Sequence, residues 1–174
     1  MKYLQGHPPE VLARVQAMLA EGRLMPWLLE RHPETHTVRS DRALQAHVAE
    51  LKARHMKNAP PLAQVRYDNH LHVVHQALGT HTAISRVQGG RLQAKREIRI
   101  ASVFKDAPAD FLRMIVVHEL AHLREREHDK AFYALCQHMA ADYHQLEFET
   151  RLWLTAREAA AGASRPQPGP PPCR

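Results

Sequence analysis

The stretch that most restricts the fold is an apolar run ending in a His-Glu-x-x-His motif, "DAPADFLRMIVVHELAHLRE" (106–125). It opens with Asp-Ala-Pro, which is typical of a helix start, and the residues that follow are apolar nearly all round. A helix of that kind is buried. His118 and His122 project from its same side, one turn apart. The sequence therefore predicts a buried helix that carries two imidazoles and the carboxylate of Glu119.

These three side chains predict a metal site. Two imidazoles one turn apart can share one ion at about 2.0–2.1 Å each. Glu119 follows the first of them, where its carboxylate can take a proton from a metal-bound water. The alternative is a pair of core histidines in a chain that contains 14. However, two polar rings and a carboxylate on a buried helix are costly unless something binds them. We therefore expect His118 and His122 to be ligands and Glu119 to be the general base.

A third ligand has to come from elsewhere, because a catalytic zinc usually takes three protein ligands and leaves one position for water. His128 lies six residues after His122. In a continued helix it would be rotated by about 240° and displaced by about 9 Å, out of reach of the ion. If His128 is a ligand, the chain must leave the helix between Leu123 and Glu127. Asp129 can then cap the next helix.

Several other polar residues are candidates for the site. Glu147 and Glu149 are alternative third ligands, and three residues are candidates for steadying an oxyanion: Tyr133, Tyr143 and His144. A second metal site is a minor alternative on a strand with alternating histidines: His70, His72 and His75.

Helices, then strands, then helices are predicted along the chain. Helical spacing of apolar residues marks 7–24 and 25–33, and Ser40 or Asp41 can cap a helix over 42–58. Segments rich in β-branched residues follow at 63–69, 71–77, 81–88 and 97–104, with Gly89-Gly90 as a turn. We interpret them as a small antiparallel sheet of three or four strands. Further helices are predicted over 129–144 and 145–160, which gives an α+β fold.

The predicted domain organisation is simple. Residues 1–58 form an N-terminal helical part that packs with the core at 59–160 as one domain, and 161–174 form a disordered, proline-rich tail. No apolar run reaches the length of a membrane span. The N-terminus has no pattern of a secretory signal. Cys136 falls in a helical pattern and Cys173 in the tail, so a reduced, cytoplasmic protein is expected. The formal net charge is +6, but the basic residues are spread along the chain, so nucleic-acid binding is a minority interpretation.

The segments "HELAHLREREHDKAF", "NAPP…YDN", "HTAISRVQGG", "FLRMIVVHELAHL" and "YHQLEFETRLWLT" resemble the YgjP-like metallopeptidase family, which is related to SprT and WLM-type minimal zincins. The resemblance covers most of residues 1–157. It implies a minimal zincin-like fold, one Zn²⁺ per chain bound by His118, His122 and His128, and Glu119 as the base. It also implies a peptide or protein substrate, paired in extended form with the strand at 97–104.

The sequence thus predicts a cytoplasmic zinc metallopeptidase that uses metal-activated water. Two alternatives remain. One is a SprT-like DNA-associated protease, and the other is a metal-binding module without turnover. The sequence does not determine the oligomeric state.

Overall fold

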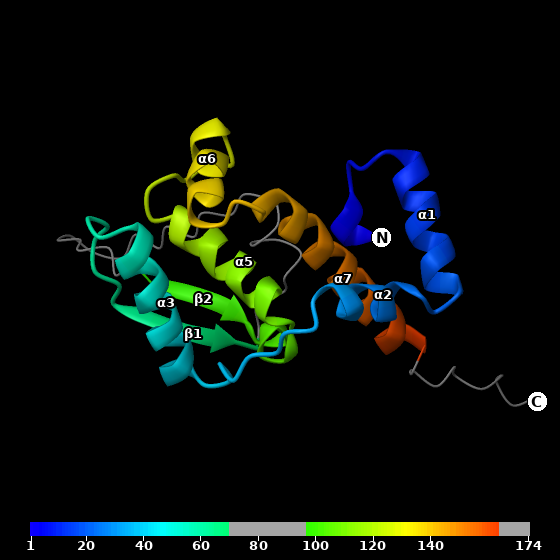
Figure 1. The fold of residues 1–174 in the computed structure, drawn as a ribbon, viewed down its shortest axis with the longest axis horizontal. Coiled ribbons are helices and arrows are strands. Elements are labelled where there is room, and N and C mark those ends of the chain that lie inside the picture. The colour runs from blue at the N-terminus through cyan, green and yellow to red at the C-terminus, as the bar shows by residue number, and fades with distance from the viewer. Residues whose placement is uncertain (70–96, 164–174) are drawn as a thin grey trace, which may run out of the picture. The chain divides into compact units, whose positions relative to one another are not determined.

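Residues 1–69 and 97–163 are described by a computed structural model of the chain (Figure 1). The predicted strands at 71–77 and 81–88, the Gly89-Gly90 turn and residues 164–174 of the tail lie outside the described residues. The chain forms two compact units. One contains residues 32–149, and the other contains residues 1–31 together with the chain from Thr150 onward. The larger unit carries the His-Glu-x-x-His motif.

The larger unit contains a two-stranded sheet. Strand β1 (Gln64–Asp68) pairs with β2 (Glu97–Ala101) in parallel, with Val65 opposite Ile98 and Tyr67 opposite Ile100. The predicted antiparallel arrangement is therefore wrong for this pair. Alternating burial indicates which face of a strand is covered but not which way its neighbour runs. The 28 residues between Asp68 and Glu97 are long enough for the crossover that a parallel pair requires.

The last strand is shorter than predicted. β2 ends at Ala101, and Ser102–Asp106 form a 3₁₀ helix, η2. The alternation within β2 is as expected, since Ile98 and Ile100 are buried and Arg99 is exposed. Phe104 is fully buried, but from the 3₁₀ helix rather than from the strand.

Two helices pack beside this sheet. Helix α3 (Asp41–His55) packs against β1, and helix α5 (Ala109–Ala121) packs against β2 and α3 (Figure 1). The Ser40 side chain accepts a hydrogen bond from the backbone N–H of Ala43, so Ser40 is the N-cap of α3. Nine of the thirteen residues of α5 are buried, as the apolar run predicts. This burial fixes the helix that carries the motif.

Two more helices follow in the chain, and the second of them begins in the larger unit and continues into the smaller one. Helix α6 (Lys130–Met139) packs against α5, and helix α7 (Tyr143–Ala163) follows it. The buried imidazole of His32 links the start of α5 to α7. Its Nδ1 lies 2.9 Å from an Asp110 carboxylate oxygen and its Nε2 lies 2.6 Å from one of Glu149. Asp110 and Glu149 are 78 and 117 residues away from His32 along the chain.

The smaller unit is helical. Helix α1 (Pro9–Ala20) contacts helix α2 (Leu24–Arg31), and a 3₁₀ helix, η1 (Lys2–Leu4), precedes them. Arg151 donates a hydrogen bond to the backbone carbonyl of Tyr3, and Lys2 pairs with Glu158. Helix α7 continues to Ala163, so the first three residues assigned to the tail are helical.

The α+β class predicted from the sequence is confirmed. The described residues contain six α-helices and one two-stranded sheet. Within residues 1–69 and 97–163, none of the helices is long and apolar enough to cross a membrane.

Candidate metal centre

The end of α5 determines where the histidines lie. The helix ends at Ala121 and His122 is its C-cap, slightly before the predicted exit between Leu123 and Glu127. The backbone N–H of Leu123 and that of Arg124 bond to carbonyls three residues back, which tightens the turn. Asp129 then caps α6 by accepting from the backbone N–H of Phe132. This reversal brings His128 back beside α5.

Three imidazole nitrogens converge as a result. His118 Nε2 lies 3.2 Å from His122 Nε2 and 3.1 Å from His128 Nε2. Ligand atoms of the three residues all lie within 4.8 Å of one another. Two nitrogens that share a tetrahedral ion at about 2.0–2.1 Å would be roughly 3.3–3.4 Å apart. The spacing of this triad therefore fits one metal ion held by three imidazoles.

The opposite ring nitrogens are held by protein groups. His122 Nδ1 lies 2.9 Å from the backbone carbonyl of Glu125. A carbonyl only accepts hydrogen bonds, so this Nδ1 carries the proton and the Nε2 of a neutral His122 has its lone pair toward the triad. His118 Nδ1 lies 2.7 Å from the Tyr143 hydroxyl. Metal-binding histidines ordinarily have such outer partners.

The ring of Phe132 contacts all three histidines. It is fully buried, and its centroid lies 5.0 Å from that of His118, 4.6 Å from that of His122 and 4.7 Å from that of His128. His118 is buried, whereas His122 and His128 are half-buried. The triad thus has an apolar side formed by α6 and keeps partial access to solvent.

Glu119 follows His118 on α5 and is half-buried. Burial raises the pKa of its carboxyl to about 8. A dication held by the triad would favour the ionised form and oppose that rise. The role of Glu119 as the base beside a bound ion stays a prediction.

The alternative acidic ligands do not join the triad. Glu149 is 1% exposed, and its two carboxylate oxygens bond to His32 and to the Gln145 amide. Glu147 is half-buried, and its charge acts on Tyr143 and Cys136. Within the described residues, the group able to hold a metal consists of the three histidines. The second site considered at His70, His72 and His75 lies outside the described residues.

The three candidates for steadying an oxyanion differ in position. Tyr143 is fully buried and its hydroxyl is bonded to His118, so it does not face a substrate and this interpretation is wrong for it. Tyr133 is half-buried, with its ring centroid 6.5 Å from that of His128 and 5.1 Å from that of the exposed His144. The role of Tyr143 behind a ligand and the ring contacts of Phe132 were missed by sequence reasoning. Tyr143 lies 25 residues from His118, and no local pattern connects the two.

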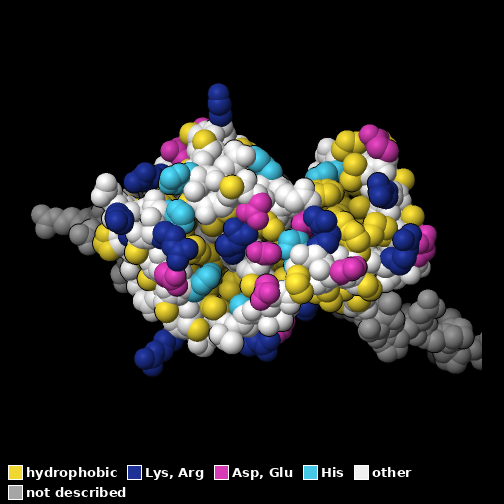
Figure 2. Space-filling view, viewed as in Figure 1, with side chains coloured by type: hydrophobic (Ala, Val, Ile, Leu, Met, Phe, Trp, Pro, Cys, Tyr) yellow, Lys and Arg dark blue, Asp and Glu magenta, His cyan; other side chains and the backbone are white. Residues whose placement is uncertain are grey.

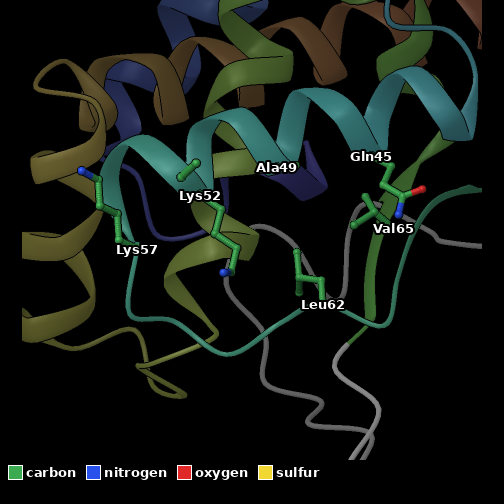
Figure 3. A pocket seen from close by; sticks show the side chains of 7 residues that line it. Gln45, Ala49, Lys52, Lys57, Leu62 and Val65 are labelled. Atoms are coloured by element: carbon green, nitrogen blue, oxygen red, sulfur yellow. The ribbon is translucent and has the colours of Figure 1, made fainter.

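A separate hollow of about 520 Å³ lies between α3 and the segment that leads into β1 (Figure 3). Its walls include Gln45, Lys52, Lys57, Leu62 and Val65, and none of the three histidines. The Nζ of Lys52 donates a hydrogen bond to the backbone carbonyl of Ala59 at 2.8 Å. The hollow is thus not part of the metal centre.

The surface charges are mixed. Figure 2 shows lysine and arginine side chains interspersed with aspartate and glutamate on the face in view, without a continuous basic patch. Cys136 is a buried free cysteine, as expected, and Cys173 lies outside the described residues. DNA association remains a minority prediction.

An α+β domain with a histidine triad beside a glutamate is typical of metal-dependent hydrolases, and comparison with known proteins agrees. The profile described as "YgjP-like, metallopeptidase domain" matches residues 29–152. The chain belongs to this family. It is also 57% identical over 155 residues to a curated protein from Escherichia coli (strain K12) named UTP pyrophosphatase, covering 89% of this chain and 93% of that protein. No solved structure matched the chain.

Proposed function

We propose that this protein is a zinc-dependent hydrolase that removes diphosphate from a nucleoside triphosphate such as UTP. The observation that carries the proposal is the triad of Nε2 atoms at ion spacing beside Glu119. The choice of substrate is supported by the 57% identity to a UTP pyrophosphatase over nearly the full length of both chains. A net charge of +6 also favours an anionic substrate.

Zinc is the proposed ion because three imidazoles with one open position are a common catalytic zinc set. When bound, the ion supplies Lewis acidity that stabilises negative charge at the centre under attack. His118, His122 and His128 hold it, and Glu119 accepts a proton from the attacking water. The water oxygen bonds to the α-phosphorus, the bond to the bridging oxygen breaks, and diphosphate leaves with the electron pair. A reduced, cytoplasmic setting is part of the proposal, since nucleotides and a free buried Cys136 fit it.

Peptide hydrolysis is the second candidate. The family is described as a metallopeptidase domain, and the same triad and base can direct water at a scissile carbonyl. Strand β2, which packs beside α5, was proposed as the strand that pairs with an extended peptide. In this reaction Glu119 passes its proton to the leaving amine.

One experiment separates these activities from metal binding without turnover. Purified protein of known zinc content is incubated with UTP, with the other nucleoside triphosphates and with a peptide library, and products are identified by chromatography and mass spectrometry. UMP and diphosphate in equal amounts support the proposal. Cleaved peptides together with intact UTP would show that the protein is a peptidase and would overturn the proposal. If neither the nucleotides nor the peptides are cleaved although each chain holds one zinc, the protein is a metal-binding module without turnover.

The matched control is Glu119→Gln, which keeps the volume of the side chain but removes the proton acceptor. Zinc content and thermal stability should stay close to the parent. Turnover should fall by about 10²–10⁴-fold, the contribution of a general base. Equal turnover in the two proteins would show that Glu119 is not the base.

A further inference from the structure

A buried tyrosine lies behind the first histidine of the triad. Tyr143 is fully buried at the start of α7, and its hydroxyl oxygen lies 2.7 Å from His118 Nδ1. The two rings are nearly parallel, with an interplanar angle of 21°. This hydroxyl is therefore an outer partner of His118 rather than a group open to substrate.

The direction of that hydrogen bond determines what His118 can do. If Nδ1–H donates to the phenol oxygen, Nε2 is unprotonated and can bind an ion. If the phenol O–H donates to Nδ1, a neutral His118 carries its proton on Nε2, which then cannot be a ligand. In that second state the Nε2–H would point at His122 or His128, which lie 3.2 and 3.1 Å away. The two tautomers therefore compete before any ion arrives.

The geometry of the triad favours the first arrangement. The Nε2 atoms of the three histidines converge at the spacing of one ion, and only an unprotonated Nε2 can bind that ion. A neutral His118 that binds through Nε2 carries its hydrogen on Nδ1, and the phenol oxygen 2.7 Å away is then the acceptor.

We propose that Tyr143 is a positioning residue whose hydroxyl oxygen accepts a hydrogen bond from His118 Nδ1–H and so holds His118 in the tautomer able to bind a metal ion. It acts through His118 and does not touch the substrate. The inference rests on the metal site of the proposed function but not on which substrate is cleaved. Outer partners of this kind typically change metal affinity by 10- to 100-fold.

The first test is the tautomer of His118 itself. The full chain is labelled with ¹⁵N, stripped of metal with a chelator and examined at pH 8 by long-range ¹H–¹⁵N correlation NMR, which distinguishes protonated from unprotonated ring nitrogens. His118→Gln identifies the signals. Nδ1–H on His118 in the metal-free parent supports the proposal. An Nε2–H tautomer there overturns it.

The second test uses Tyr143→Phe, which keeps the buried ring and removes the hydroxyl. Zinc affinity, measured by competition with a chromophoric chelator, should fall by about 10- to 100-fold. Tyr67→Phe is the matched control, since Tyr67 is also buried and its hydroxyl donates to the Val38 carbonyl at 2.6 Å, on β1. Both variants lose a buried hydrogen bond and should lose some thermal stability. Only Tyr143→Phe should lose zinc affinity, and equal affinities in the two variants would overturn the proposal.

Both tests measure the tautomer of His118 or the zinc affinity rather than turnover. A chain that binds zinc tightly through His118 but cleaves no UTP would contradict the proposed function and leave this inference intact.

Discussion

The ring of Phe132 offers a direct test of how the triad is held. Phe132 is fully buried and makes ring contacts with all three histidines, at centroid distances between 4.6 and 5.0 Å. Phe132→Leu keeps the site apolar but removes the aromatic faces and edges. Each aromatic pair contributes about 0.5–1.5 kcal/mol beyond its buried area, so the loss of the three pairs should cost about 1.5–4.5 kcal/mol. In a chain of this length that corresponds to a fall in Tm on the order of 10 °C.

The change should also affect metal binding, because three ligands lose a shared contact that restricts their orientations. We expect zinc affinity to fall by about 10-fold or more. Phe111→Leu is the matched control. Phe111 is equally buried on the same helix as the first ligand, where its ring lies 4.6 Å from that of His32. It precedes His118 by seven residues, which is about 10 Å along α5.

The assay combines thermal unfolding of the metal-free proteins, followed by circular dichroism, with chelator competition for zinc. Both variants should unfold at lower temperature than the parent. Only Phe132→Leu should bind zinc more weakly. If the two variants lose zinc affinity equally, or if neither does, Phe132 does not orient the triad and only its packing contributes to the fold.

Three further predictions follow from the same structure. His128→Ala should weaken zinc binding by orders of magnitude. Glu149→Gln should lower the stability, because it changes the contact with His32, but should leave one zinc per chain by elemental analysis. Zinc lost from Glu149→Gln and kept by His128→Ala would make the glutamate the ligand. Removing the ion with a chelator should lower Tm, and zinc at about 100 times its Kd should restore roughly 2.7 kcal/mol of stability; an unchanged Tm would contradict a native ion at the triad. Burial opposes ionisation of Asp110, but hydrogen bonds from His32 and Arg113 outweigh it and hold the pKa below its usual 3.8. Its carboxylate therefore stabilises the fold above that value, and this stabilisation is lost as pH falls through the lowered pKa. The free energy of unfolding by urea should thus decrease less between pH 5 and pH 2 in Asp110→Asn than in the parent. An equal decrease in the two proteins would contradict this assignment.

Features set by a few neighbouring residues could be predicted from the sequence. Ser40 or Asp41 was expected to cap one helix and Asp129 another. Ser40 and Asp129 each accept a hydrogen bond from the backbone N–H three residues ahead. An exit from the helix between Leu123 and Glu127 was inferred from the position of His128, and α5 ends slightly earlier, at Ala121. These are local consequences of chain geometry, so no partner distant in the sequence is needed to infer them.

Features that depend on distant partners could not be predicted. The direction of the β1–β2 pairing depends on the path of the 28 residues between them, and the residue pattern of each strand is compatible with either direction. Similarly, Tyr143 was considered as a substrate-facing group because its distance from the motif left its orientation open. Only the packing of α7 places its hydroxyl on His118 Nδ1.

The proposed cleavage of a phosphoanhydride and the alternative cleavage of a peptide make different demands on Glu119. A diphosphate leaving group departs as a stable anion, so the carboxylate is needed only to accept a proton from water. An amine leaving group must be protonated, so for a peptide Glu119 has to accept a proton and then return it. As the proposed base, the half-buried Glu119 would have to meet only the first demand if the substrate is a nucleoside triphosphate. The second also requires the carboxyl to reach the departing nitrogen. Cleavage of a phosphoanhydride therefore requires less of Glu119 than cleavage of a peptide. This supports the proposed nucleotide substrate, which is also the substrate in the name of the Escherichia coli relative.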